Sequence, residues 1–316
     1  MITFGIDIGG TFIKIIAVNE NYKILKSQKF ATPCHLSSSK FLLFFADIIN
    51  AWKRELQIKD AIIGIGIAGD TDHKKGILRF APNLPWAGFK IASGLKKLTA
   101  CKCFVSNDAN MAAFGVYKKE FKGRYKNILV LTLGTGIGGG IIIEGNLYQG
   151  ATGTAGEFGH IKVSNSKESN LCGCGARGCL ESYIGTNNLK KLTLSYVKEN
   201  PKSIIAMLLK KEKFSVEILS RAASKKDKFA LKTWQYFGTY LGFGLANLIL
   251  SFNPDAIVLS GGISGGAKYF MPAVRQVFKV QKIKEPFKNI KLLISKTKDI
   301  GALGAALYAL SVNDEK

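Results

Sequence analysis

Residues 2–18 read ITFGIDIGGTFIKIIAV, and residues 127–143 read NILVLTLGTGIGGGIII. In each segment an apolar run ends at a glycine-rich turn, and a second apolar run follows at once. Two β-strands joined by a tight turn fit this pattern, because short apolar runs bounded by turn residues are typical of buried strands. The pattern occurs twice, so it predicts an α/β fold with two similar halves that face each other across a cleft.

Strands and helices are expected to alternate after each copy of this pattern. Apolar runs predict further strands at residues 22–30, 61–68, 101–105, 256–259 and 291–294. Helical periodicity predicts helices at residues 41–56, 107–117, 229–252 and 300–310. We place a first lobe at residues 1–117, with the terminal helix 300–316 packing back on it, and a second lobe at residues 118–299.

The two glycine turns have the chemistry of phosphate-binding loops, because bare backbone lets N–H groups approach phosphate oxygens. The first turn contains Asp7, Gly9, Gly10 and Thr11, and the second contains Gly134, Thr135, Gly136 and Gly138. Thr11 can add a hydroxyl donor. Asp7 would repel phosphate directly and is better suited to hold Mg²⁺ through water. An ordinary glycine hairpin is the alternative for each turn.

The glycine pattern favours a nucleoside triphosphate over a dinucleotide. A strand pattern follows the glycines of residues 134–140, whereas the dinucleotide fingerprint needs a helix there. A third turn, at Ser260, Gly261 and Gly262, ends another predicted strand. Gly261 and Gly262 could accommodate the adenine and ribose of ATP, or they could simply join a strand to a helix.

A cluster of cysteines and one histidine lies in residues 157–182, which read EFGHIKVSNSKESNLCGCGARGCLES. The set His160, Cys172, Cys174 and Cys179 would complete a tetrahedral zinc site and leave no position for a catalytic water. The segment 157–181 is therefore predicted to bind zinc structurally. The carboxylates of Glu157 and Glu181 flank it.

Asn107 and Asp108 follow a predicted strand and open a predicted helix. Asn and Asp are preferred helix N-caps, so a structural role alone would explain them. Phosphoryl transfer to an alcohol needs a carboxylate within hydrogen-bond reach of the attacking hydroxyl. Asp108 is therefore a candidate general base, and Asn107 a candidate hydroxyl binder. Asn83, in a loop with Trp86, adds an amide and an aromatic ring of the kind that suits sugars.

Composition narrows the class of protein further. The chain has 45 Lys and Arg against 22 Asp and Glu, a net charge of +23. No stacking aromatics are interleaved with the lysines, so we expect a solvated basic surface and no nucleic-acid partner. The apolar runs are too short for a membrane span, and no export signal is recognisable at the start. Cytoplasmic localisation is expected, with the cysteines reduced.

These motifs, in this order, resemble the ROK family of sugar kinases, which have an actin-like (ribonuclease H-like) ATPase fold similar to that of hexokinase. The resemblance rests on the turns at 7–11 and 134–140, on Asn107-Asp108, on residues 157–160 and on the cysteine block 172–181. It covers nearly the whole chain. It implies a duplicated fold with two lobes around a cleft and a small zinc-binding insertion.

The resemblance also implies roles for single residues. Asp108 would accept the proton of the sugar's primary hydroxyl. The residues implied to bind sugar hydroxyls are Asn83, Asn107, Glu157, His160 and Glu181. The implied zinc ligands are His160, Cys172, Cys174 and Cys179, and the two glycine turns would bind phosphates. ATP, Mg²⁺ and a structural Zn²⁺ are the implied cofactors, and the implied assembly is a homodimer.

The predicted function is ATP-dependent phosphorylation of the 6-hydroxyl of glucose, because the loop 83–86 looks most like that of glucokinases. N-acetylmannosamine and N-acetylglucosamine kinases share the same sugar-binding set and stay open as alternatives. Residues 68–76 depart from the family's pattern, which affects the substrate and not the chemistry. A ROK-type transcriptional regulator is an alternative of another class; the resemblance implies a DNA-binding domain ahead of the kinase-like fold, and with Asp7 so near the start we expect none here. An inactive sugar-binding relative would have no need of Asp108 and both turns.

Overall fold

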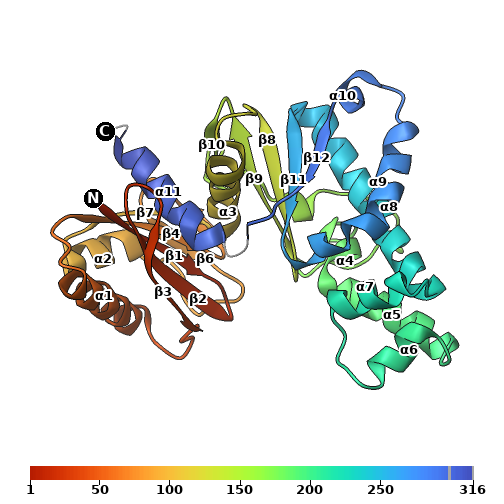
Figure 1. Ribbon diagram of the computed structural model, residues 1–316, viewed down its shortest axis with the longest axis horizontal. Coiled ribbons are helices and arrows are strands. Elements are labelled where there is room, and N and C mark those ends of the chain that lie inside the picture. Colours follow the sequence, from red (N-terminus) through yellow and green to blue (C-terminus); the bar gives the residue numbers. More distant parts are fainter. Residues whose placement is uncertain (298–299, 315–316) are drawn as a thin grey trace. The chain divides into compact units, whose positions relative to one another are not determined.

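A computed structural model describes residues 1–297 and 300–314 (Figure 1). Contacts divide the chain into two compact units. The first comprises Met1–Asn127, Gly140–Gly156 and Thr297–Lys316, and the second comprises Ile128–Gly139 and Glu157–Lys296. The lobe boundary expected between residues 117 and 118 stays a prediction. The expected ends at residues 299 and 316 lie outside the described residues.

The first unit is built on a five-stranded sheet with the order β3-β2-β1-β4-β7. Its strands are β1 (Ile2–Ile8), β2 (Phe12–Val18), β3 (Ile24–Ala31), β4 (Ala61–Ile67) and β7 (Lys102–Asn107). β1, β4 and β7 run parallel, and β2 and β3 run antiparallel beside them. The carboxyl ends of the three parallel strands therefore lie at one edge, where Asp7 and Asn107 are found.

The two faces of this sheet are covered differently. One face packs against α1 (Ser38–Glu55) and α2 (Ile91–Thr99), and large apolar side chains such as Phe4, Ile65 and Phe45 fill the space between them. The other face packs against α11 (Ile300–Asp314), which also contacts α3 (Asp108–Val116). Figure 1 shows α11 on the side of the sheet opposite α1 and α2.

The contact between α3 and α11 requires glycine. A Cβ atom at Gly304 would overlap the carbonyl oxygen of Met111, and one at Gly115 would lie 2.8 Å from the Cα of Gly304. The two helix backbones can approach this closely only without side chains between them. Because Met111 lies in the helix that Asn107 and Asp108 begin, this packing fixes the helix behind the candidate base.

Gly304→Ala is therefore expected to destabilise the protein. Forcing a methyl group against backbone that cannot move aside costs about 1–3 kcal/mol or more. Chemical denaturation monitored by circular dichroism measures this loss. Gly265→Ala is the matched control, since its Cβ would meet nothing within 4 Å, and it should leave the midpoint almost unchanged. Equal midpoints for the two variants would contradict the packing argument.

Several elements of the first unit differ from the sequence-based expectation. Residues 70–80 form a hairpin of β5 (Asp70–Asp72) and β6 (Ile77–Phe80), which was not predicted, and α2 was also missed. The helix expected to reach residue 117 ends at Val116, and a π-helical turn, η1 (Tyr117–Phe121), follows it.

A second five-stranded sheet repeats the strand order of the first. Its order is β10-β9-β8-β11-β12, and contacts assign β10 and the part of β9 from Gly140 onward to the first unit. The strands are β8 (Ile128–Leu133), β9 (Ile137–Ile143), β10 (Asn146–Tyr148), β11 (Ala256–Ser260) and β12 (Lys291–Ile294). β8, β11 and β12 are parallel. The duplicated α/β organisation predicted from the strand–turn–strand repeat is thus present in the topology.

Helices make up most of the rest of the second unit. α8 (Lys228–Phe252) begins at the N-cap Asp227 and packs against α9 (Ala267–Lys279), with Trp234, Phe237 and Phe270 buried between them. The shorter helices are η2 (Phe158–His160), α4 (Glu181–Ile184), α5 (Thr186–Glu199), α6 (Ile204–Leu209), α7 (Val216–Ser224), η3 (Gly262–Gly266) and α10 (Glu285–Lys288). Among the described residues, none of the helices has the length and apolarity to cross a membrane.

Candidate functional site

The first glycine turn is held in place from behind. The Gly9 N–H donates to the Phe12 carbonyl at 3.1 Å, and the Thr32 hydroxyl donates to the Gly9 carbonyl at 2.6 Å. A Cβ at Gly10 would lie only 2.9 Å from the Cβ of Asn83. The structure therefore brings Asn83 next to the turn of Gly9, Gly10 and Thr11, and Thr11 is exposed.

Asp7 lies against α11, a contact that the sequence around Asp7 did not predict. It ends β1 and is half-buried. A Cβ at Gly301 would overlap the Asp7 carboxylate, so this carboxylate lies against the first turn of α11. The positive end of a helix dipole stabilises a negative charge there. The Asp7 carboxylate is thus held at the strand end, beside the glycine turn.

Asn107 and Asp108 have separate tasks at the start of α3. The Asn107 Oδ1 accepts hydrogen bonds from the N–H groups of Ala109 (2.8 Å) and Asn110 (3.4 Å), so Asn107 is the N-cap. Its Nδ2 donates to the Gly69 carbonyl at 3.1 Å. The half-buried Asp108 is the first helical residue, and its Oδ1 accepts from the Ala109 N–H at 2.9 Å. Asn107 is therefore the N-cap, and the Asp108 carboxylate adds a bond to an N–H group that Asn107 already accepts from.

In the second unit, the glycine turn after β8 is fixed by two neighbours. The Gly134 carbonyl accepts hydrogen bonds from the Thr186 N–H (3.1 Å) and the Thr186 hydroxyl (2.8 Å). The Ile137 N–H donates to Oε2 of Glu181 at 2.8 Å. Thr135 and Gly136, at the tip of the turn, are exposed. These contacts leave the exposed backbone of the tip in a defined conformation.

The third turn lies directly beside the second. Gly261 has φ +89°, and a Cβ there would overlap the carbonyl oxygen of Leu133, the last residue of β8. Gly262 is exposed, with nothing within 4 Å of its Cβ position. The structure thus brings Gly134–Gly136 and Gly261–Gly262 together at the carboxyl ends of neighbouring parallel strands. This is the edge where α/β sheets bind ligands.

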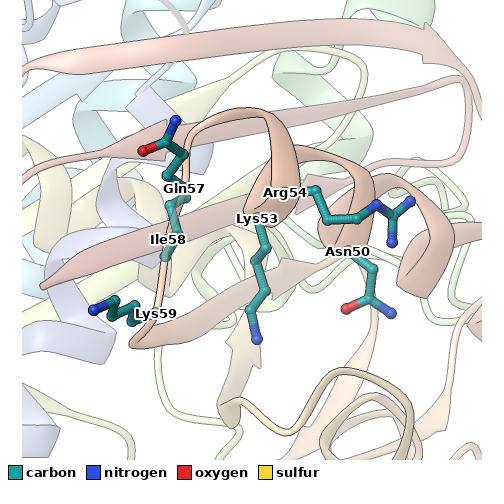
Figure 2. Close-up of a pocket in the computed structure, with 6 residues that line it drawn as sticks. All are labelled: Asn50, Lys53, Arg54, Gln57, Ile58 and Lys59. Atoms are coloured by element: carbon teal, nitrogen blue, oxygen red, sulfur yellow. The ribbon is translucent and has the colours of Figure 1, made fainter.

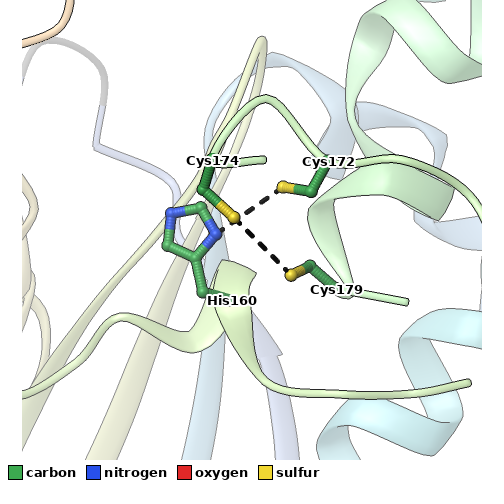
Figure 3. Close-up of side chains that lie close together, drawn as sticks. All are labelled: His160, Cys172, Cys174 and Cys179. Atoms are coloured by element: carbon green, nitrogen blue, oxygen red, sulfur yellow. Dashed lines mark hydrogen bonds between the residues drawn. The ribbon is translucent and has the colours of Figure 1, made fainter. Parts of the chain in front are cut away.

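The cysteine block forms a compact cluster with His160 (Figure 3). One ligand atom from each of His160, Cys172, Cys174 and Cys179 lies within 4.8 Å of the others. Cys174 Sγ and Cys179 Sγ are 3.8 Å apart, and Cys172 Sγ is 3.7 Å from His160 Nδ1. Two sulfurs about 2.3 Å from a shared tetrahedral zinc ion would be about 3.8 Å apart. The donor set and its spacing therefore fit Zn²⁺.

The thiols of this cluster differ in acidity. Burial raises the pKa of Cys172 to about 12. The backbone N–H of Ala176, which donates to the Cys174 sulfur, lowers the pKa of that thiol. Metal coordination requires thiolates, so a divalent cation would replace the Cys172 proton when it binds.

Two carboxylates border the cluster on different sides. The His160 Nε2 faces Glu157 Oε2 at 3.9 Å, and both side chains are exposed. Glu181 Oε1 lies 4.0 Å from Cys172 Sγ. The structure thus groups Glu157, His160 and Glu181 in the second unit, whereas Asn83, Asn107 and Asp108 belong to the first.

Two contacts in these sites were not predicted from the sequence. Glu181 was expected to bind sugar, but one of its oxygens holds the backbone of the second glycine turn. Arg79 received no role, yet it donates to Asp70 Oδ1 at 2.5 Å and to the Thr152 carbonyl at 2.5 Å. Arg79 therefore fixes the segment before Glu157 on the β5–β6 hairpin. No sequence pattern marks the contacts of Glu181 with Ile137 and of Arg79 with Thr152, because these partners lie 44 and 73 positions apart in the chain.

A separate basic pocket lies at the end of α1, outside these sites. It has a volume of about 460 Å³ and is lined by Asn50, Lys53, Arg54, Gln57, Ile58 and Lys59 (Figure 2). The Lys53 Nζ donates to the Thr99 carbonyl at 3.0 Å, which ties α1 to α2. The pocket is an open, lysine-rich surface and contributes to the positive charge of the chain.

Comparisons with known proteins agree with this arrangement. The sequence model of the ROK family matches residues 3–312. A glucokinase of Thermotoga maritima is 33% identical over 312 residues, which cover 96% of this chain and 95% of that protein. A xylose repressor of Caldicellulosiruptor bescii is 27% identical over 93% of this chain and 74% of the repressor.

Solved structures show the same relationship. A ROK family glucokinase from Streptomyces griseus, in complex with glucose and AMPPNP, superposes with a TM-score of 0.80. It is 32% identical, and the match covers 98% of this chain and 100% of that one.

Proposed function

Because the chain belongs to the ROK family, we propose that it is an ATP-dependent sugar kinase that phosphorylates the 6-hydroxyl of glucose. The observation that carries this proposal is the separation of tasks at Asn107 and Asp108. The Asn107 amide caps α3, and the half-buried Asp108 carboxylate is held in place at the first turn by the Ala109 N–H. A hydroxyl-activating base needs this kind of fixed carboxylate.

In the proposed reaction, the Asp108 carboxylate accepts the proton of the sugar's 6-hydroxyl. The hydroxyl oxygen forms a bond to the γ-phosphorus of ATP while the bond from that phosphorus to the β–γ bridging oxygen breaks. The products are the sugar 6-phosphate and ADP, and the proton then passes from Asp108 to solvent. Catalysis of this kind depends on positioning the reacting groups and on stabilising charge. The fixed start of α3 would contribute by holding the Asp108 carboxylate in one position.

The phosphates of ATP are assigned to the glycine turns. The turn of Gly9, Gly10 and Thr11 and that of Gly134, Thr135, Gly136 and Gly138 offer backbone N–H groups and hydroxyls. Gly261 and Gly262 are assigned to the adenosine. Bound Mg²⁺ would neutralise phosphate charge, and Asp7 is the carboxylate assigned to hold it through water.

The sugar is assigned to the polar side chains that the family resemblance implies. Asn83 lies beside the first glycine turn, and Asn107 lies beside the base. Glu157 and His160 lie at the rim of the cysteine cluster. Zn²⁺ bound to His160, Cys172, Cys174 and Cys179 would act structurally and keep His160 oriented. Glu181 is also assigned to the sugar, with one oxygen directed at Cys172 and the other at the turn.

A side-by-side assay tests the proposed substrate. ADP release should be measured with glucose, N-acetylglucosamine, N-acetylmannosamine, mannose and fructose at equal concentrations. Glucose is expected to give the highest kcat/KM. A higher kcat/KM for N-acetylmannosamine or N-acetylglucosamine would identify the chain as one of the alternative sugar kinases. Residues 68–76, which depart from the family's pattern, would then be the first segment to replace with the usual glucokinase sequence. Absence of ADP release with every sugar would contradict kinase activity.

A sugar-responsive regulator is the second candidate, because the chain is similar to xylose repressors and carries a net charge of +23. A gel-shift experiment at two salt concentrations separates the two functions. Binding by surface lysines alone weakens steeply between 50 and 200 mM salt. We expect this behaviour, with no sequence preference. Sequence-specific binding that xylose or glucose releases would favour the regulator.

A homodimer is proposed from the family resemblance. Light scattering during size-exclusion chromatography tests it directly. A mass of one chain at micromolar concentration would contradict it.

A further inference from the structure

The Glu181 side chain lies between the cysteine cluster and the second glycine turn. Its Oε2 accepts the Ile137 N–H at 2.8 Å, and its Oε1 lies 4.0 Å from Cys172 Sγ. A Cβ at Gly136 would be only 2.7 Å from Oε2, so the carboxylate lies directly under the turn. A carboxylate would repel phosphate rather than bind it. The hydrogen bond to the Ile137 N–H explains why the Glu181 carboxylate lies here.

A short stretch of chain connects Glu181 to the cluster. Cys179 is two residues before it, and the Ser182 hydroxyl and N–H both donate to the Cys179 carbonyl, at 2.7 and 3.0 Å. After it, the Gly185 N–H donates to the Glu181 carbonyl at 2.9 Å, and Thr186 donates to the Gly134 carbonyl. The segment 179–186 is thus bonded to the cluster at one end and to the glycine turn at the other.

A second connection starts from the histidine side of the cluster. Gly159, the neighbour of His160, packs against the same turn, because a Cβ there would lie 2.5 Å from the Ile137 carbonyl oxygen and 3.4 Å from Glu181 Oε2. Two chain segments leave the cluster, one through Gly159 and one through Glu181, and both contact the peptide groups of Ile137. Ile137 is therefore the residue at which the two connections from the cluster meet.

We propose that Glu181 is a positioning residue through which the cation in the His160–Cys172–Cys174–Cys179 cluster sets the conformation of the turn Gly134–Ile137. Occupancy of the cluster then controls the affinity for the phosphates of the nucleotide, in addition to that for the sugar. This inference rests on the proposed function, since it takes the turn to be a phosphate loop. It adds a coupling between a structural metal and nucleotide binding within the second unit.

Nucleotide binding without sugar tests the coupling. A non-hydrolysable ATP analogue with Mg²⁺ is titrated calorimetrically into zinc-loaded protein and into protein freed of zinc by chelation and dialysis. Zinc removal is expected to weaken binding of the analogue about tenfold in the wild type. Glu181→Ala should weaken it to a similar extent, and zinc removal should then have little further effect. Glu181→Gln keeps an acceptor for the Ile137 N–H and should retain most of the affinity.

Glu157→Ala is the matched control. Its carboxylate borders His160 on the other side of the cluster, so this variant should lose affinity for the sugar and keep its affinity for the nucleotide. Hydrogen exchange of the peptide covering residues 134–140 provides a readout that does not depend on ligand. Exchange at Ile137 should become faster on zinc removal and in Glu181→Ala. If a variant fails to fold, the comparison of zinc-loaded and zinc-free wild type by exchange still decides.

Two results would overturn the inference while leaving the kinase in place. One is an unchanged nucleotide affinity in the wild type after zinc removal. The other is an equal effect of zinc removal in the wild type and in Glu181→Ala, which would show that the coupling does not pass through this residue. Zinc-loaded wild type that binds no ATP analogue at all would instead contradict the proposed function together with the inference.

Discussion

Asp108→Asn is expected to lower kcat by about 10²–10⁴-fold, the usual contribution of a positioned general base. The amide has nearly the size of the carboxylate and can still accept the hydrogen bond from the Ala109 N–H. It cannot accept the proton of the sugar hydroxyl. The sugar dissociation constant should therefore change only a few-fold. Steady-state kinetics and calorimetric titration of glucose measure the two quantities separately.

Asp60→Asn is the control for this substitution. Asp60 is an exposed carboxylate in the loop before β4, and its replacement should leave kcat within about twofold. Asn107→Ala has a different expected result, because it removes the N-cap of α3 and costs about 0.5–2 kcal/mol of stability. A kcat near the wild-type value for Asp108→Asn would show that another group accepts the proton.

Removal of the metal is expected to have the largest effect on stability. Cys179→Ala deletes a buried ligand and leaves only His160, Cys172 and Cys174 to hold a cation. Structural zinc contributes folding free energy directly. A loss of about 4 kcal/mol would lower Tm by roughly 6 °C for a chain of 316 residues. Differential scanning calorimetry of zinc-loaded protein, chelated protein and the variant measures it.

Cys103→Ala is the control for the cysteine variant. Cys103 lies on β7 of the first unit, and burial raises the pKa of its thiol to about 12, but it has no place in the cluster. This variant should keep one zinc per chain and a response to chelation like that of the wild type. Melting temperatures that do not change on complete zinc removal would contradict a structural role for the metal.

The sequence was most informative where a local pattern determines local structure. The apolar runs and glycines of residues 2–18 and 127–143 give β1, β2, β8 and β9 within a residue or two. The helix expected at residues 41–56 begins three residues earlier, at Ser38, because the Ser37 side chain caps it by accepting from the Lys40 N–H. The β5–β6 hairpin was missed because its first strand is short and reads Asp-Thr-Asp, a turn-like composition.

The sequence was sufficient to predict which residue types form the candidate site. It was not sufficient to predict most of the contacts between them. The cysteine spacing identifies the cluster, because ligands close in sequence can converge without knowledge of the fold. The choice between Asn107 and Asp108 as N-cap was open in the sequence, since both residues are good caps. The contact of Glu181 with Ile137 joins residues 44 positions apart, and Asp7 meets α11 from the other end of the chain. Only tertiary packing sets such contacts.

In the proposed reaction this chain transfers the γ-phosphoryl group of ATP to the 6-hydroxyl of a hexose, with Asp108 as the base. The most direct measurement is nuclear magnetic resonance of the product formed from ATP, Mg²⁺ and glucose by zinc-loaded protein. We expect one new phosphomonoester signal, coupled to the protons on C6, that forms with the wild type and not with Asp108→Asn over the same time. Free phosphate without a sugar ester, or the same ester at the same rate from Asp108→Asn, would contradict it.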